Sequence, residues 1–404
     1  MKKLRVSLAQ INPTVGDLNG NAGKIIEYIK MARGKGADIV AFPEMAVTGY
    51  PPEDLLLKPH FIKDSQKIVK TIQEETKGIT AIVGFVDGEK EIFNSAAVLH
   101  DGELSAVYRK MYLPNYGVFD EERYFRRGKE PLIIVLNGIN IGINICEDIW
   151  YPEGPTRSQA RAGAEVIINI NASPFHYGKW NIRENMVSTR AADNSVAIAY
   201  VNMVGGQDDL VFDGHSMVFS KEGKLIARGR SFEEELITVD LSINSEFGVR
   251  NSEKDISSVK KNTLPQIKDR SSYPAIPAPI EVTPPSTIEE VYKALVLGTR
   301  DYVAKNGFKK VVIALSGGVD SALVSAIASD AIGKENLTAC FLPSVYSSKE
   351  SREDAEAVAE NLGIRLITIP IQDTFESYLR ALMEVFTGLE PNITEENLQA
   401  RARG

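Results

Sequence analysis

The segment INIGINICEDIW, residues 139–150, carries both a clear fold signal and a candidate reactive side chain. Isoleucine recurs at every second position from Ile139 to Ile145, which is the spacing of a strand with one buried face. Cys146 follows at once, and a helix that begins there would favour a thiolate through its N-terminal dipole. A small apolar cysteine packed in a core is the alternative, and the spacing alone leaves both open.

Similar strand patterns occur on both sides of this segment, with helical patterns between them. Short apolar or alternating runs predict strands, and amphipathic runs predict helices. Many strands with interleaved helices indicate a layered α/β or α+β domain. The expected strands are 4–10, 36–44, 81–85, 95–100, 105–110, 164–170 and 197–204, and the expected helices are 22–36 and 180–194.

The last part of the chain alternates regularly between helix and strand patterns, which predicts a doubly wound parallel sheet. Its expected elements are a helix at 287–307, a strand at 309–315, a helix at 321–333, a strand at 337–343, a helix at 351–363 and a strand at 364–371. Before it, residues 265–285 contain six prolines, which disfavour helices. We interpret that stretch as a linker between domains at 1–264 and 286–404.

The composition excludes several classes of protein. The 404 residues include 46 basic and 54 acidic side chains, and the net charge of −8 argues against broad binding to nucleic acids or anionic membranes. Two cysteines, Cys146 and Cys340, exclude a disulfide framework and indicate a reducing, cytoplasmic location. The four histidines lack zinc-site spacing. There is no signal-peptide pattern and no apolar run of about 18 residues, so no membrane span is expected.

Two charged residues also follow apolar runs. Glu44 ends Phe42-Pro43-Glu44, and Lys110 ends Tyr108-Arg109-Lys110. A carboxylate at a strand end is a plausible base, and an ammonium can hold a developing anion. A solvated loop acid and a surface lysine are the commoner cases, and no spacing rule links the two residues to Cys146.

Taken together and in order, these blocks with Ile145-Cys146-Glu147-Asp148 resemble the catalytic blocks of the nitrilase/amidase superfamily. The resemblance extends over about residues 4–245. It implies an α-β-β-α sandwich and hydrolysis of an amide or nitrile through a thioester. It also implies catalytic roles for Glu44, Lys110 and Cys146, with Glu121 as a supporting acid that orients the lysine.

A glutamate, a lysine and a cysteine in these roles can carry out the hydrolysis without a histidine. A glutamate can deprotonate the thiol and later protonate the leaving ammonia if burial raises its pKa. A lysine and a backbone N–H can stabilise the oxyanion of the tetrahedral intermediate.

The last part carries the string SGGVDS, residues 316–321, directly after a strand pattern. Glycines let the backbone turn and aim N–H groups at an anion, although a Gly-Gly turn can also be merely structural. The string is not a Walker A loop. It resembles the pyrophosphate loop of ATP-pyrophosphatase ligases, which implies that Asp320 holds Mg²⁺. The implied ATP-binding residues are Ala314, Leu315, Ser316, Gly317, Gly318, Val319, Asp320 and Ser321.

An amidase followed by such a ligase resembles the glutamine-dependent NAD synthetase family. Further matching blocks lie at 113–120, 171–175, 212–216, 343–348 and 396–401. The resemblance implies a carbon–nitrogen ligase whose substrates are glutamine, ATP with Mg²⁺, and deamido-NAD, with no tightly bound organic cofactor. It implies that Tyr116, Ser173 and Lys179 contact glutamine and that Asn397 contacts deamido-NAD; from the residues alone, none of these four would be chosen.

Members of that family continue beyond the position of Gly404, so the resemblance implies that the Rossmann-like ligase part is truncated here and that its site is incomplete. It also implies a homo-oligomer. Two alternatives remain: an amidase fused to a ligase with a different product, and a scaffold that keeps the fold without catalysis.

Overall fold

The computed structural model describes residues 2–243, 259–267, 275–277, 282–388, 390 and 392–403. They form two compact units, Met1–Ala294 and Leu295–Gly404, which are described separately. Residues 268–274 and 278–281 of the predicted linker lie outside the described residues. Among the residues that are described, no helix is both long and apolar enough to cross a membrane.

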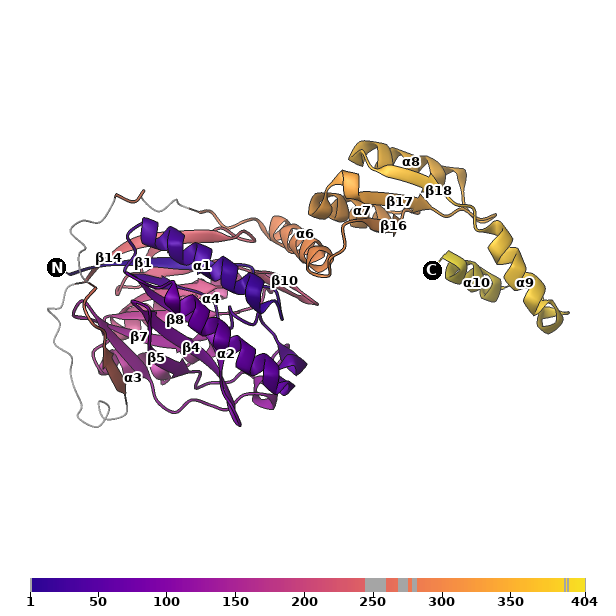
Figure 1. The fold of residues 1–404 in the computed structure, drawn as a ribbon. Coiled ribbons are helices and arrows are strands. Elements are labelled where there is room, and N and C mark those ends of the chain that lie inside the picture. The colour runs from indigo at the N-terminus through magenta and orange to yellow at the C-terminus, as the bar shows by residue number, and fades with distance from the viewer. Residues whose placement is uncertain are drawn as a thin grey trace. The chain divides into compact units, whose positions relative to one another are not determined.

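The first unit contains two large mixed sheets (Figure 1). In the six-stranded sheet, β14 and β1 are antiparallel, β1, β2 and β3 are parallel, and β4 and β5 continue as antiparallel neighbours. In order across the sheet, the strands are β14 (Glu235–Ile243), β1 (Lys2–Gln10), β2 (Ile39–Ala41), β3 (Thr80–Gly88), β4 (Ile92–His100) and β5 (Glu103–Arg109).

The second sheet has seven strands, with β7, β8 and β9 parallel at its centre. In order they are β13 (Leu225–Arg228), β12 (Met217–Phe219), β9 (Ala197–Asn202), β8 (Val166–Asn171), β7 (Ile139–Ile145), β6 (Leu132–Leu136) and β15 (Lys260–Thr263). A separate hairpin joins β10 (Val204–Gln207) to β11 (Leu210–Asp213).

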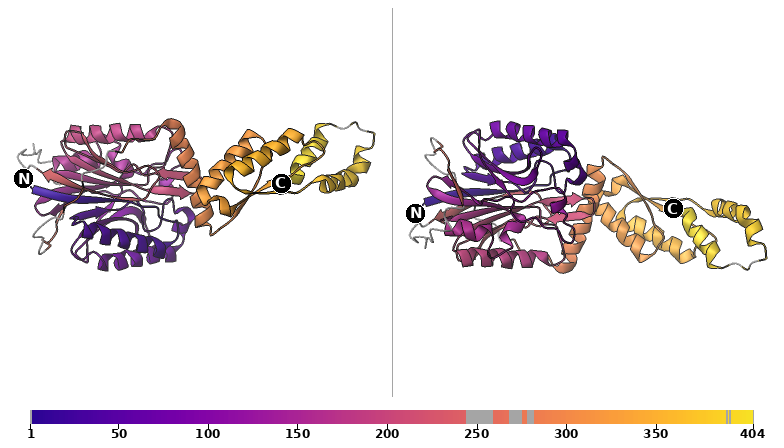
Figure 2. Two further views of the ribbon diagram at one scale, coloured as in Figure 1. Left: turned by 90° about the horizontal axis from the view of Figure 1, so that it is seen from above. Right: turned by 90° about the horizontal axis from the view of Figure 1, so that it is seen from below.

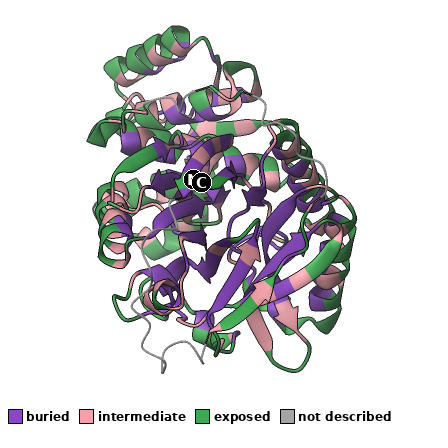
Figure 3. Cartoon of the chain, turned by 90° about the vertical axis from the view of Figure 1, so that its left-hand side faces the viewer, coloured by how far each residue is buried: buried purple, intermediate pink, exposed green. Residues whose placement is uncertain are grey.

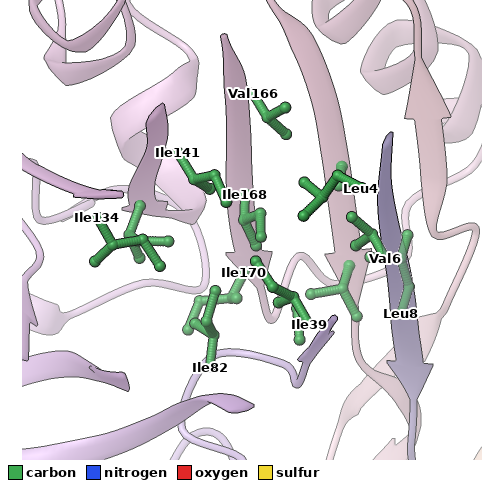
Figure 4. Close-up of a cluster of buried hydrophobic side chains, with 14 of the residues drawn as sticks. Leu4, Val6, Leu8, Ile39, Ile82, Ile134, Ile141, Val166, Ile168 and Ile170 are labelled. Carbon is green, nitrogen blue, oxygen red and sulfur yellow. The ribbon is translucent and has the colours of Figure 1, made fainter. Parts of the chain in front are cut away.

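The two sheets face each other, and helices cover their outer faces (Figure 2). Helices α1 (Leu18–Gly34) and α2 (Pro59–Glu74) pack on the first sheet, while α3 (Pro155–Arg161) and α4 (Lys179–Asn194) pack on the second. Side chains such as Leu4, Ile82 and Ile168 fill the space between the sheets (Figure 4), and the strands are accordingly buried (Figure 3). The predicted α-β-β-α sandwich is confirmed.

Both faces of the central strands are buried, and their sequences are therefore nearly continuous apolar runs. The alternation at 139–145 is confirmed as β7, and Ile139, Ile141, Ile143 and Ile145 all join the core between the sheets. The sequence patterns missed α2, α3, β6 and the strands from β10 onward in this unit. Most of these strands are only three or four residues long, too short for a periodicity to be read.

The second unit contains the parallel sheet β16 (Val311–Ala314), β17 (Leu337–Phe341) and β18 (Arg365–Thr368). Helices α7 (Val319–Ile332) and α8 (Lys349–Leu362) pack against it, so the predicted Rossmann-like parallel sheet is confirmed. Helices α9 (Gln372–Phe386) and α10 (Ile393–Arg403) follow, and α6 (Thr287–Lys305) runs from the first unit into the second.

A close backbone contact in the first unit requires glycine at position 84, on β3. A Cβ atom there would lie 2.3 Å from the Pro43 carbonyl oxygen and 2.4 Å from the Met45 nitrogen. Both are backbone atoms, so the contacts cannot be relieved by a side-chain rotation. Gly84 therefore lets the turn around Glu44 lie directly against the sheet.

We expect Gly84→Ala to lower the free energy of unfolding by about 2 kcal/mol, because the turn must shift to admit the methyl group. Urea denaturation of the full chain measures this. Gly23→Ala is the matched control: Gly23 is exposed on α1, and a methyl group there would meet no atom within 4 Å, so this change should stabilise by about 0.5–1 kcal/mol. Equal stability of the two variants would contradict this account.

Candidate active site

Three strand ends bring Glu44, Lys110 and Cys146 into one region. Glu44 lies just beyond β2, Lys110 directly follows β5, and Cys146 directly follows β7. Glu44 and Lys110 are fully buried, and Cys146 is 3% exposed. The commoner alternatives of a loop acid and a surface lysine are therefore wrong for these two residues.

The Lys110 ammonium lies between two carboxylates. Its Nζ donates to Glu44 Oε1 at 2.7 Å and to Glu121 Oε1 at 2.8 Å. Burial alone would lower the pKa of Lys110, but the Glu121 and Glu44 carboxylates raise it well above its usual value. The lysine is therefore a fixed, buried cation in contact with both acids.

Glu121 is itself buried. Burial and the neighbouring Glu44 raise its pKa from 4.5 to about 7, against the opposing effect of Lys110. Tyr50 OH donates to its Oε1 at 3.0 Å, and Asn94 Nδ2 lies 3.3 Å from its Oε2.

Glu44 has two further donors besides the lysine. Asn94 Nδ2 donates to Oε1 at 2.6 Å, and the Ala172 backbone N–H donates to Oε2 at 2.9 Å. Neither Asn94 nor Tyr50 was predicted from the sequence. Asn94 immediately precedes the predicted strand at 95–100, but one asparagine beside a strand carries no signal of its own.

Cys146 begins a 3-10 turn, Cys146–Ile149, and has a φ of +43°. Such a φ is costly for a residue with a side chain and is found where surrounding structure enforces it. Burial and the Glu44 charge raise the pKa of Cys146 well above its usual value, against the opposing effect of Lys110. Only a short 3-10 turn begins at Cys146, so the helix dipole that was expected to favour a thiolate is small. With its pKa raised, Cys146 rests as a thiol and needs a base to become a nucleophile.

Asp148 joins the segment after Lys110 to the turn at Cys146. Its Oδ2 accepts from Tyr108 OH at 2.7 Å and Ile145 N at 3.0 Å, and its Oδ1 accepts from the Met111 and Tyr112 amides at 3.1 and 2.9 Å. All four partners are donors, so only a carboxylate satisfies them. Asp148 thus fixes the chain on which Lys110 lies relative to Cys146.

Three further residues, Tyr116, Ser173 and Lys179, are predicted to contact glutamine. Tyr116 is 58% exposed, and its OH lies 3.0 Å from Glu147 Oε2. Ser173 is buried, with its amide bound to Asn202 Oδ1 at 2.9 Å. Lys179 Nζ donates to the Pro174 carbonyl at 3.3 Å, and burial lowers its pKa. Tyr116 thus contacts the residue that follows Cys146, and Ser173 follows Ala172, whose amide donates to Glu44.

In the second unit, residues 315–318 form the turn between β16 and α7. Gly317 has a φ of +85°, and a Cβ there would lie 2.3 Å from the Ser351 carbonyl oxygen. Ser321 Oγ accepts from the Ser316 amide at 3.1 Å and donates to the Gly318 carbonyl at 2.9 Å. The turn is thereby held at the N-terminus of a fourteen-residue helix, a position that favours anions.

Asp320 is exposed in the first turn of α7. No group of three His, Cys, Asp or Glu side chains suited to a metal occurs among the described residues. One carboxylate still fits Mg²⁺ that arrives with a nucleotide, because the phosphates and water supply most of its ligands.

Asn397 is exposed on α10, two residues before Gln399, whose Oε1 accepts from Arg403 Nη2 at 2.7 Å.

Two known protein families match the chain, one over each of its two parts. The carbon–nitrogen hydrolase family matches residues 5–248, and the NAD synthase family matches residues 291–404. A glutamine-dependent NAD(+) synthetase from Thermotoga maritima is 48% identical over all of this chain and 71% of its own length.

Solved structures give the same result. A glutamine-dependent NAD+ synthetase from Acinetobacter baumannii, in complex with ADP, has a TM-score of 0.87 and 37% identity, covering 100% of this chain and 71% of that one. An amidase from Nesterenkonia sp. has a TM-score of 0.53 and 26% identity, covering 59% of this chain and 90% of that one.

The raised pKa of Glu121 predicts a pH-dependent stability. Between pH 4.5 and about 7 the folded chain keeps a proton that the unfolded chain releases. The contribution of Glu121 to the free energy of unfolding is therefore complete below pH 4.5 and is lost as the pH rises toward 7. The free energy of unfolding falls by up to about 1.4 kcal/mol for each pH unit in that range. Glu121→Gln should remove this dependence in urea denaturation at pH 5, 6 and 7. The neighbouring Glu122→Gln, at an exposed position, should follow the wild type; parallel curves for all three would refute the assignment.

Proposed function

The chain belongs to the glutamine-dependent NAD(+) synthetase family, and we propose that Cys146, Lys110 and Glu44 are the residues that release ammonia from glutamine in its first unit. The observation that carries this proposal is the buried Lys110 ammonium, which lies 2.7 Å from Glu44 on a segment that Asp148 joins to the Cys146 turn. A base, a fixed cation and a thiol in one dry site are the groups that amide cleavage through a thioester needs.

In the proposed reaction, Glu44 takes the thiol proton as Cys146 Sγ attacks the amide carbon of glutamine. The carbonyl electrons move to oxygen, and Lys110 stabilises that oxyanion. The C–N bond then breaks, and Glu44 returns the proton to the leaving ammonia, so that a glutamyl thioester remains. Glu44 next deprotonates a water, which attacks the thioester and releases glutamate and the free thiol.

Tyr116, Ser173 and Lys179 would hold the rest of the glutamine. Free glutamine carries an ammonium and a carboxylate on its α-carbon. The Lys179 ammonium suits the carboxylate, and the Glu147 carboxylate, with Tyr116 OH 3.0 Å from its Oε2, suits the ammonium. Opposite charges at the rim would therefore select an amino acid over a simple amide.

In the second unit, Ala314 to Ser321 would hold the phosphates of ATP, with Mg²⁺ on Asp320. Adenylation of the deamido-NAD carboxylate releases diphosphate, and ammonia then displaces AMP to give NAD. Asn397 would contact deamido-NAD. We further propose a first domain at 1–264, a linker at 265–285 and a second domain at 286–404. The family matches at 5–248 and 291–404 are compatible with these limits. A homo-oligomeric state is also part of this proposal.

The two alternatives are less well supported. A ligase with a different product does not explain the match of residues 291–404 to NAD synthases. A scaffold without catalysis does not explain why two acids and a lysine are kept buried together, since such a cluster is expensive to desolvate.

We expect Cys146→Ala to abolish glutamate release from glutamine, because no other group can form the thioester. Cys340→Ala, at the other buried cysteine, should retain the wild-type rate. The assay uses glutamine labelled on its amide nitrogen, with ATP, Mg²⁺ and deamido-NAD, and mass spectrometry of glutamate and labelled NAD. Equal glutamate release by both variants would refute the role of Cys146. If the wild type releases glutamate but forms no NAD, only the glutamine hydrolysis proposed for the first unit is present.

A second prediction concerns glutamine recognition. We expect Tyr116→Phe to raise KM for glutamine about threefold to tenfold with kcat nearly unchanged, because it removes one hydrogen bond remote from the reacting carbon. Tyr177→Phe is the matched control, since both tyrosines are 58% exposed. An unchanged KM in Tyr116→Phe would remove Tyr116 from the site.

A further inference from the structure

Asn202 is a fully buried amide at the end of β9, where the pairing between β8 and β9 stops. The last paired residues of the two strands are Asn171 and Asn202. From β8 the chain continues as Ala172-Ser173-Pro174, and the ring of Pro174 removes a backbone donor. Ser173 is buried, so its backbone groups need hydrogen-bond partners from outside the strand pair.

The Asn202 side chain supplies those partners. Its Oδ1 accepts from the Ser173 N–H at 2.9 Å, and its Nδ2 donates to the Ser173 carbonyl at 3.2 Å. Arg183 Nη1 lies 3.4 Å from the same carbonyl oxygen. One amide side chain thus meets both backbone groups of Ser173, as a residue of a neighbouring antiparallel strand would.

Asn202 is itself fixed by a series of buried polar groups. Its Nδ2 also donates to the Gly214 carbonyl at 2.9 Å, and its backbone N–H donates to Ser216 Oγ at 3.0 Å. The Ser216 N–H in turn donates to Gln10 Oε1 at 3.0 Å, at the end of β1. The amide of Asn202 therefore cannot rotate without leaving a buried donor or acceptor unpaired, which is costly.

The residue before Ser173 makes a separate contact with the catalytic centre. The Ala172 N–H donates to Glu44 Oε2 at 2.9 Å, and Glu44 has two further side-chain donors. Loss of the Asn202 amide would therefore release Ser173, while Glu44 keeps all of its own partners.

Resting on the proposed contact of Ser173 with glutamine, we propose that Asn202 is a positioning residue for that substrate. Its amide extends the pairing of β8 and β9 by one residue and so holds Ser173 at the site. Asn202 acts through Ser173 and takes no part in the reaction at Cys146. A change at Asn202 should therefore affect the binding of glutamine and not the chemical step.

The test measures the release of glutamate from glutamine by the full chain. Asn202→Ala loses all three side-chain hydrogen bonds and should raise KM for glutamine about tenfold. The value of kcat should stay within about twofold of the wild type. The rate at which neutral iodoacetamide alkylates Cys146 should not change.

Asn21→Ala is the matched control, because Asn21 makes the same set of hydrogen bonds to other residues and is 3% exposed. Its Oδ1 accepts from the Thr14 N–H at 2.8 Å. Its Nδ2 donates to the Thr14 carbonyl at 2.8 Å and to the Val47 carbonyl at 3.1 Å. Both substitutions should lower the free energy of unfolding, but only Asn202→Ala should raise KM.

Asn202→Asp gives a second test that does not depend on the alanine variant. A neutral carboxylic acid can accept from the Ser173 N–H and donate to its carbonyl, whereas a carboxylate can only accept. Burial favours the neutral form at the lower pH. We expect KM of Asn202→Asp to exceed that of the wild type about threefold at pH 6 and about tenfold at pH 8. Asn21→Asp should have the wild-type KM at both pH values.

A wild-type KM in Asn202→Ala overturns the inference, as does an equal rise of KM in Asn21→Ala or a loss of kcat without a change in KM. If Asn202→Ala does not fold, an increase of KM in Asn202→Asp that is the same at pH 6 and pH 8 overturns it. No glutamate release from the wild type would instead overturn the proposed function, and this inference with it.

Discussion

The buried contact between the Lys110 ammonium and the carboxylates of Glu44 and Glu121 is the constraint on which the first unit depends. One cation between two acids leaves an excess negative charge in a dry interior, where an unpaired ion is very costly. The protein relieves this with donors from Asn94, Tyr50 and the Ala172 amide, and with a pKa near 7 for Glu121. Removing the lysine would leave two facing carboxylates, so this polar cluster must form as a whole.

The sandwich supplies the rigidity that such a cluster needs. Glu44 and Lys110 come from one sheet and Cys146 from the other, so the apolar core between the sheets fixes their separation. Gly84 lets the Glu44 turn lie against β3, and Asp148 ties the Lys110 segment to the Cys146 turn. Packing and catalysis are thus linked through a few backbone contacts at strand ends.

The sequence predicted the parts of the molecule that repeat a simple pattern. The alternation at 139–145 and the strand–helix alternation after 308 correspond to β7 and to the parallel sheet. The resemblance in three short blocks selected Glu44, Lys110 and Cys146, and the structure brings Glu121 to the lysine as well. Asn94 and Tyr50 could not be selected, because their importance comes from neighbours that are distant along the chain. Single polar residues carry no periodicity, and their contacts exist only after the chain has folded.

The central claim is that Cys146 forms a covalent bond with the acyl group of glutamine beside Lys110. The most direct measurement is rapid acid quenching of the full chain during turnover with glutamine, followed by mass spectrometry of its peptides. The account predicts a mass increase equal to one glutamyl group on the Cys146 peptide, none on the Cys340 peptide, and loss of the added mass after treatment with hydroxylamine. Steady glutamate formation with no added mass on Cys146 at any quench time, or with the glutamyl group on another residue, would contradict it.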